Sequence, residues 1–150
     1  MIYIVCREEG APRTLDEISK ASSIAKRDIG KTYRYIARKL DLKILPAKPQ
    51  DYVPRFGSLL DLDERVQVKA VKVLDEATKY DVTSGKGPIG VAAAALYIAA
   101  VLEGKRKAQR EVADAIGVTE VTIRNRYKEI VDHLGIGKEI EEKVKEEEEQ

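Results

Sequence analysis

Apolar residues recur at spacings of three and four along most of the chain, the period of helices that bury one face. In residues 63–80 the apolar positions are Val66, Ala70, Val73, Leu74 and Ala77. Asp63 precedes this run and is a suitable N-cap. Residues 50–61 carry a similar apolar side, with Pro54 near the expected helix start, where a missing N–H costs little. The pattern predicts two consecutive helices.

A third segment, residues 89–102, is apolar nearly all round and is therefore expected to be buried on every side. It follows a loop rich in Gly, Ser and Pro at residues 83–88. It is shorter than the roughly 20 residues that span a bilayer, so it does not predict a membrane helix. We expect it to be the central helix of a five-helix unit.

The next two segments predict a helix-turn-helix. Residues 109–116 form the first expected helix, Gly117 the turn and Thr119 the N-cap of the second helix. The expected inward positions of the second helix are Ile123, Tyr127, Ile130 and Leu134. This spacing leaves Val121 and Arg124 on the outer side, near the helix start.

The outer side of this second helix carries residues that suit DNA. Arginine can donate two hydrogen bonds to guanine in the major groove, and valine can contact the methyl group of thymine. We therefore predict that Arg124 and Val121 contact bases. The residues predicted to contact phosphates are Lys105, Arg106, Lys107, Arg110, Arg126 and Lys128.

Other candidate sites are weaker. Residues 85–90 match G-x-G-x-x-G, but no strand is expected before them, so we predict no dinucleotide or other cofactor. Lys86, beside the N–H groups of the helix that begins near Pro88, favours an anion such as phosphate. The chain has one cysteine, Cys6, and one histidine, His133, so we predict no metal site. We find no catalytic constellation and expect no enzyme.

The beginning of the chain repeats its later part. A shift of 94 positions aligns residues 2–42 with residues 96–136 without a gap. The identical pairs include Tyr3/Tyr97, Glu9/Glu103, Gly10/Gly104, Ile29/Ile123, Tyr33/Tyr127 and Ile36/Ile130. We interpret this as a duplicated helical unit. The first copy starts inside the equivalent of the central helix, so its two preceding helices are expected to be absent, either in a fragment or in a shortened relative.

The first copy differs where DNA bases would be read. Its expected inward positions are Ile29, Tyr33, Ile36 and Leu40. Gly30 stands at the position of Arg124 and Arg27 at the position of Val121, so we do not expect base contacts there. The basic residues that suit phosphates or an acidic protein surface are Arg13, Lys26, Arg27, Lys31 and Arg34.

The net charge of +1 conceals an uneven distribution. Residues 1–43 hold ten Lys and Arg against six Asp and Glu, and residues 104–128 hold seven against three. Residues 137–150 hold three Lys against seven Glu and read as an acidic tail, with residues 146–149 expected to fray because their charges repel. With 43% apolar residues the chain should fold, and one cysteine without a signal peptide favours a cytoplasmic protein.

Several motifs resemble the core of the archaeal transcription factor B family, which is related to eukaryotic transcription factor IIB. The resemblance covers residues 1–136. Its motifs are PRTLDEI at residues 12–18, TSGKGP at residues 83–88, AAAALY at residues 92–97 and TEVTIRNRYKE at residues 119–129. It implies an all-α fold of cyclin-like five-helix repeats, here one truncated and one complete, with the second ending in the helix-turn-helix.

With this fold, we expect a truncated first repeat at residues 1–43, a linker at residues 44–49, a complete repeat at residues 50–136 and the acidic tail at residues 137–150. The linker contains Pro46 and Pro49. The truncation would expose apolar residues at positions 1–5 and favour self-association.

The resemblance also implies a function. Members of the family bind the TATA-binding protein on promoter DNA, and the final helix-turn-helix reads an upstream element. By motif position, Val121 and Arg124 would contact bases, and Arg13, Lys26 and Arg27 would face the TATA-binding protein or nearby DNA. The residues that would meet phosphate are Lys86, Lys105, Arg106, Lys107 and Lys128.

The zinc ribbon and the polymerase-binding segment of the family have no counterpart in this sequence, so binding to RNA polymerase is expected only if that region is supplied. A cyclin-like adaptor that binds proteins and no DNA remains the alternative, because the first helix-turn-helix lacks base-reading residues.

Overall fold

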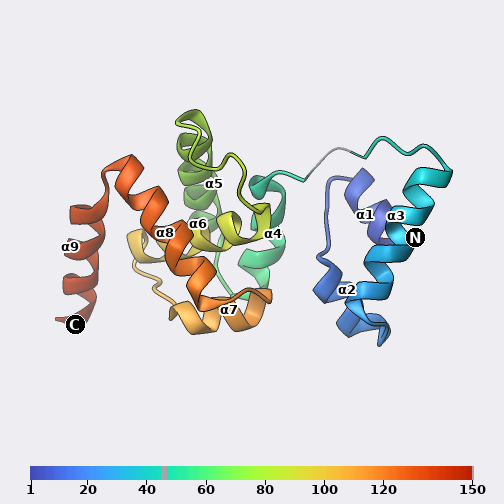
Figure 1. The fold of residues 1–150 in the computed structure, drawn as a ribbon. Coiled ribbons are helices and arrows are strands. Elements are labelled where there is room, and N and C mark those ends of the chain that lie inside the picture. Colours follow the sequence, from blue (N-terminus) through green and yellow to red (C-terminus); the bar gives the residue numbers. More distant parts are fainter. Residues whose placement is uncertain (45–46, 150) are drawn as a thin grey trace. The chain divides into compact units, whose positions relative to one another are not determined.

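The computed structural model describes residues 1–44 and 47–149, and these residues form helices with no strand among them (Figure 1). The all-α prediction is confirmed. The helices are α1 (Ile2–Glu8), α2 (Leu15–Ser22), α3 (Lys26–Lys39), α4 (Pro49–Leu59), α5 (Glu64–Lys79), α6 (Pro88–Leu102), α7 (Gln109–Ile116), α8 (Glu120–Leu134) and α9 (Gly137–Glu148).

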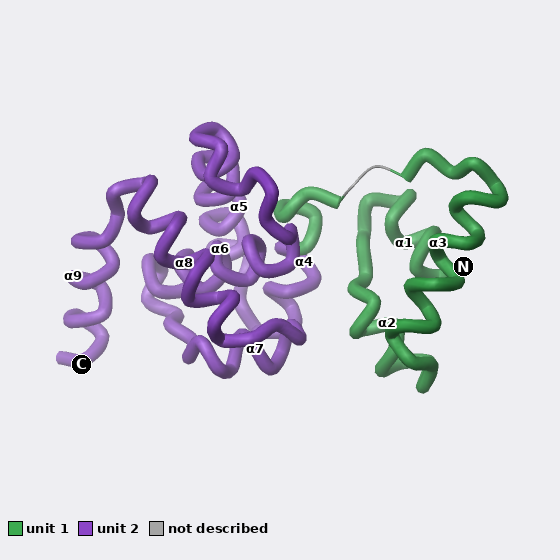
Figure 2. The backbone as a smooth tube through the Cα atoms, viewed as in Figure 1, with its two compact units in different colours: residues 1–52 green, residues 53–150 purple. Residues whose placement is uncertain are grey.

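The chain divides into two compact units, residues 1–52 and residues 53–150 (Figure 2). Part of the expected linker, residues 45–46 with Pro46, lies outside the described residues. Helix α4 already begins at Pro49, so Pro54 lies inside the helix and not in its first turn. Only the first four N–H groups of a helix lack intrahelical partners. Pro54 therefore removes a hydrogen bond, and our expectation that it lies at the helix start was wrong.

Helix α6 is the centre of the second unit, as its all-round apolar sequence predicts. Every residue from 90 to 101 is buried, and α6 packs against α5, α7, α8 and α9. Gly90 allows the close approach of α8, since a Cβ atom at this position would lie 2.7 Å from Cγ2 of Thr122. The start of α8 is thus held directly against the central helix.

The last helix, α9, includes residues 146–148, which we expected to fray. It extends from Gly137 to Glu148, and Ile140 is only 4% exposed. The contact between α9 and α6 explains the difference, because burial of an apolar side chain against the central helix compensates for repulsion between glutamates. Residues 137–148 are therefore an ordered helix of the second unit.

The first unit consists of α1, α2, α3 and the start of α4. Tyr3 and Tyr33 meet edge to face with ring centroids 4.8 Å apart, and the matching pair in the second unit, Tyr97 and Tyr127, does the same at 5.4 Å. The same aromatic contact in both units supports the duplication inferred from the sequence. Leu40, however, is 63% exposed, because α3 ends at Lys39. The expectation that Leu40 points inward was wrong.

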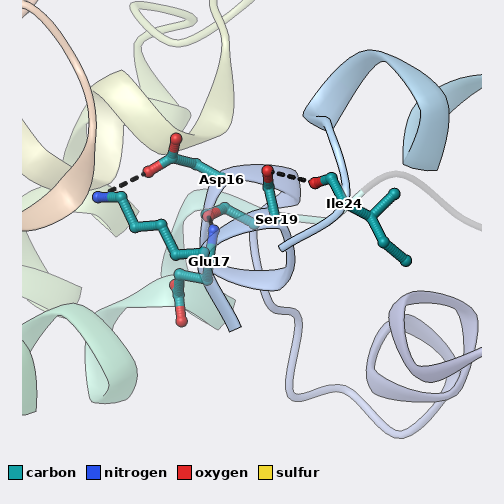
Figure 3. A network of polar contacts seen from close by, with 6 residues as sticks. Asp16, Glu17, Ser19 and Ile24 are labelled. Atoms are coloured by element: carbon teal, nitrogen blue, oxygen red, sulfur yellow. Dashed lines mark hydrogen bonds and ion pairs between the residues drawn. The ribbon is translucent and has the colours of Figure 1, made fainter. Parts of the chain in front are cut away.

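Polar contacts fix the turn between α2 and α3 (Figure 3). The Ser19 hydroxyl donates a hydrogen bond to the carbonyl of Ile24 at 2.6 Å, and the backbone N–H of Ile24 donates to the Ser22 hydroxyl at 3.3 Å. Ser23 takes the left-handed conformation here (φ 59°), where the second unit has Gly117. The first helix-turn-helix therefore closes through side-chain hydrogen bonds in place of a glycine turn.

The start of the first unit exposes apolar side chains, as expected. Met1 and Ile2 are exposed, and they line a hollow of about 370 Å³ together with residues of α2 and α3 such as Ile18 and Ile29. Self-association through this hollow stays a prediction. None of the helices in the described part of the chain is long and apolar enough to cross a membrane.

Candidate nucleic-acid interface

The helix-turn-helix of the second unit forms as the sequence predicts. Helix α7 spans Gln109–Ile116, Gly117 adopts a left-handed conformation with φ 87°, and α8 follows. Ile123 and Ile130 are fully buried on the inner side of α8, whereas Tyr127 and Leu134 are half-buried. The inward positions are thus confirmed, with partial exposure of the last two.

The outer side of α8 presents the two residues that we expect to read bases. Arg124 is exposed, and the Val121 side chain is 58% exposed. Both lie in the first two turns of a helix whose next residue on the inner side, Ile123, is completely buried. The rotation of α8 about its axis is therefore fixed by the core, and this rotation directs Val121 and Arg124 to solvent.

The start of α8 is capped by a threonine. The Thr119 hydroxyl accepts a hydrogen bond from the N–H of Thr122 at 3.1 Å, and the two threonine hydroxyls lie 2.9 Å apart. The N-cap predicted from the sequence is confirmed. This cap fixes the first turn, which carries Val121.

We expect Thr119→Ala to lower the free energy of unfolding by about 1 kcal/mol, because one N–H at the helix start loses its partner. Chemical denaturation followed by circular dichroism measures the change. Thr119→Ser keeps the hydroxyl and should stay close to the wild type. Equal losses for both variants would show that the methyl group, and not the hydrogen bond, stabilises this turn.

The basic loop, which we define as residues 104–107, connects α6 to the residue before α7. Lys105 and Arg106 are exposed, and half-buried Lys107 lies 3.8 Å from the carboxylate of Glu111. The loop lines a hollow of about 340 Å³ that Asp61, Leu62, Asp63 and Glu147 also line. The three basic side chains are therefore brought together, but acidic groups share their surroundings.

Lys86 and Arg126 share one carboxylate. The Nζ atom of Lys86 lies 3.5 Å from Oε1 of Glu129, and Nη1 of Arg126 lies 3.3 Å from Oε2 of the same residue. The Arg126 side chain is only 19% exposed, and the contact of Lys86 with Glu129 links α8 to the loop before α6. Glu129 was missed in the sequence because its partner Lys86 is distant along the chain. Phosphate contacts by Lys86 and Arg126 stay predictions.

Two further groups complete the surroundings of α8. Lys128 is exposed on the outer side, as expected for a phosphate contact. Arg110 of α7 is also exposed and lies 3.8 Å from the carboxylate of Asp114.

Burial raises the pKa of Tyr127, and the neighbouring Tyr97 and Glu141 raise it further, while Arg106 lowers it. Tyr127 is therefore a neutral, half-buried group at neutral pH.

The first unit carries the remaining predicted site residues. Lys26 and Arg27 are exposed in the first turn of α3, and Arg13 is half-buried before α2. Gly30, at the position of Arg124, is buried, and a Cβ atom there would lie 3.5 Å from Leu15. This geometry leaves no outward side chain where the second unit has its arginine. Among the described residues, no three His, Cys, Asp or Glu side chains are grouped to hold a metal ion.

Comparison with known proteins places these features in a family. The model of the transcription factor TFIIB repeat matches residues 1–39 and 43–133. The chain is 55% identical over 135 residues to transcription initiation factor IIB of Archaeoglobus fulgidus, and these residues are 90% of this chain and 41% of the relative.

Two further archaeal relatives show the same similarity over 135 residues. Transcription initiation factor IIB 2 of Thermococcus kodakarensis is 56% identical, and transcription initiation factor IIB of Methanocaldococcus jannaschii is 57% identical. The match covers 90% of this chain in both cases, but 44% and 20% of the relatives, respectively. The chain thus spans less than half the length of the relatives that it matches.

Proposed function

Because the chain belongs to the transcription factor TFIIB repeat family, we propose that it forms the promoter-binding part of a transcription initiation factor. In this proposal the second unit inserts the start of α8 into the major groove of promoter DNA. The relatives that it matches are named transcription initiation factor IIB. The proposed function consists of binding and includes no catalytic step.

The observation that carries the proposal is the orientation of α8. Its buried side fixes the helix on α6, its cap fixes the first turn, and its outer side presents Val121 and Arg124 to solvent. Arginine at such a position can bind guanine through two hydrogen bonds, and valine can contact thymine. A helix held rigidly in this way is suited to read bases.

The surrounding basic groups supply the contacts that carry no sequence information. We assign the basic loop, Lys128 and the pair formed by Lys86 and Arg126 to DNA phosphates. In the first unit we assign Arg13, Lys26 and Arg27 to the TATA-binding protein or to DNA beside it.

Fluorescence anisotropy of a labelled TATA-box duplex, with and without TATA-binding protein, tests the proposal. We expect the chain to bind the DNA complex of the TATA-binding protein more tightly than either component alone. Binding to the TATA-binding protein that is unaffected by DNA would support a protein-binding adaptor instead. Absence of binding to both would contradict the proposed function.

Lys128→Ala should weaken binding to all DNA sequences by a similar factor, because a phosphate contact does not discriminate between bases. The slope of log affinity against log salt concentration should decrease by about one ion. Lys79→Ala removes an equal charge from the last residue of α5 and serves as the control. An unchanged slope for Lys128→Ala would remove this residue from the interface.

A further inference from the structure

Helix α9 lies beyond the part of the chain that the family model matches, which ends at residue 133. Residues 137–150 carry seven Glu and three Lys, so they are the most acidic segment of a chain that is otherwise basic around its helix-turn-helix. The match to the family therefore does not extend to α9. The negative charge of α9 is opposite to that expected of a surface that binds DNA.

The position of α9 is fixed by packing. Ile140 is buried, α9 contacts α6, and Val144, one turn later, is half-buried. The helix therefore holds its glutamates at defined places on the second unit. It does not behave as a mobile acidic tail whose charge is averaged over the surface.

One of these places is beside the basic loop. Glu147 lines the same hollow as Lys105, Arg106 and Lys107. Its Oε1 atom is shielded from solvent and, within the described residues, makes no hydrogen bond. A shielded carboxylate at this position lowers the positive potential of the loop more than an exposed carboxylate would, because less water screens it.

A second observation brings α9 and the loop together. The hydroxyl of Tyr127 on α8 feels the charge of Glu141 from α9 and that of Arg106 from the loop, and the two shift its pKa in opposite directions. Acidic groups of α9 and basic groups of the loop thus act on the same part of α8. Glu141 and Glu147 project from different faces of α9, so each is placed near a basic group by a separate observation, Glu141 through Tyr127 and Glu147 through the hollow.

We propose that α9 is an intramolecular competitor of DNA phosphate, which partly neutralises the basic loop and lowers the affinity of the chain for DNA of any sequence. This inference rests on the proposed function, because it requires the loop to bind phosphate. The effect acts on the electrostatic part of binding and leaves the contacts of Arg124 with bases unchanged. It therefore weakens binding to specific and nonspecific DNA by the same factor.

Glu147→Gln tests the inference, since it removes the charge and keeps the size of the side chain. We expect it to tighten binding to both a preferred and a scrambled duplex by about two- to fivefold at low salt, as for loss of one weak ionic interaction. The gain should decrease as salt rises. Glu142→Gln makes the same charge change at an exposed position of α9 and should produce a smaller gain.

Two more variants make the result decisive. In a Lys105→Ala, Lys107→Ala background, Glu147→Gln should produce no gain beyond that of Glu142→Gln. Glu141→Gln, at an exposed position, should tighten binding in the wild-type background and serves if Glu147→Gln disturbs the helix, which circular dichroism would reveal.

Equal gains for Glu147→Gln and Glu142→Gln, or weaker binding by Glu147→Gln, would overturn the role of α9. Loss of both lysines without effect on DNA binding would overturn it as well, because α9 would have nothing to compete for. If the wild-type chain bound no DNA complex at all, the proposed function itself would fail.

Discussion

Ile123→Ala should lower the free energy of unfolding by about 2–5 kcal/mol, as expected for truncation of a fully buried isoleucine. Ile123 is completely buried on the side of α8 that packs against α6. Removal of its side chain leaves a cavity that these two helices cannot close without moving. Because the same packing fixes the rotation of α8, DNA binding should weaken too.

Denaturation by urea, followed by circular dichroism at 222 nm, measures the change in stability. Val121→Ala is a matched control, since it shortens an apolar side chain on the same helix at an exposed position. It should change stability by no more than about 0.5 kcal/mol. A similar stability for Ile123→Ala and Val121→Ala would show that α8 is not held by its buried side.

Arg124→Ala should cost about 1–3 kcal/mol in binding to a preferred upstream sequence and little in binding to a scrambled one. The reason is that an arginine that donates two hydrogen bonds to guanine discriminates between bases, whereas a phosphate contact does not. The preferred sequence is obtained by selection from duplexes randomised beside a TATA box. Binding in the presence of TATA-binding protein is then measured for both duplexes.

Arg110→Ala is the control for this prediction. It removes the same charge from an exposed position on the preceding helix, α7, and should weaken binding to both duplexes equally. If Arg124→Ala also weakened both duplexes equally, Arg124 would be a phosphate contact and the base-reading role would be wrong.

Features with a local cause could be predicted from the sequence. The bounds of α7 and the start of α8 follow from Gly117 and Thr119, which end one helix and cap the next within three residues. The central position of α6 follows from its composition, because a helix without a polar side must be covered all round.

Features that depend on contacts between distant segments could not be predicted. Residues 137–148 have few apolar positions, and the helix that they form depends on a place for Ile140 against α6. Likewise, the carboxylate of Glu129 binds Lys86, which lies before α6. No local sequence pattern predicts that pair. The residues that we expect to contact DNA were identified by their types, but the acidic groups beside them became visible only in three dimensions.

The central claim, that the first turn of α8 lies against DNA bases, is tested most directly by site-specific photocrosslinking. A photoreactive phenylalanine derivative replaces Val121 in one variant and the exposed Val68 of α5 in a control. In the complex with TATA-binding protein and promoter DNA, we predict crosslinks from position 121 to bases beside the TATA box and none from position 68. Crosslinks from position 121 to protein alone, or DNA crosslinks of equal yield from both positions, would contradict the claim.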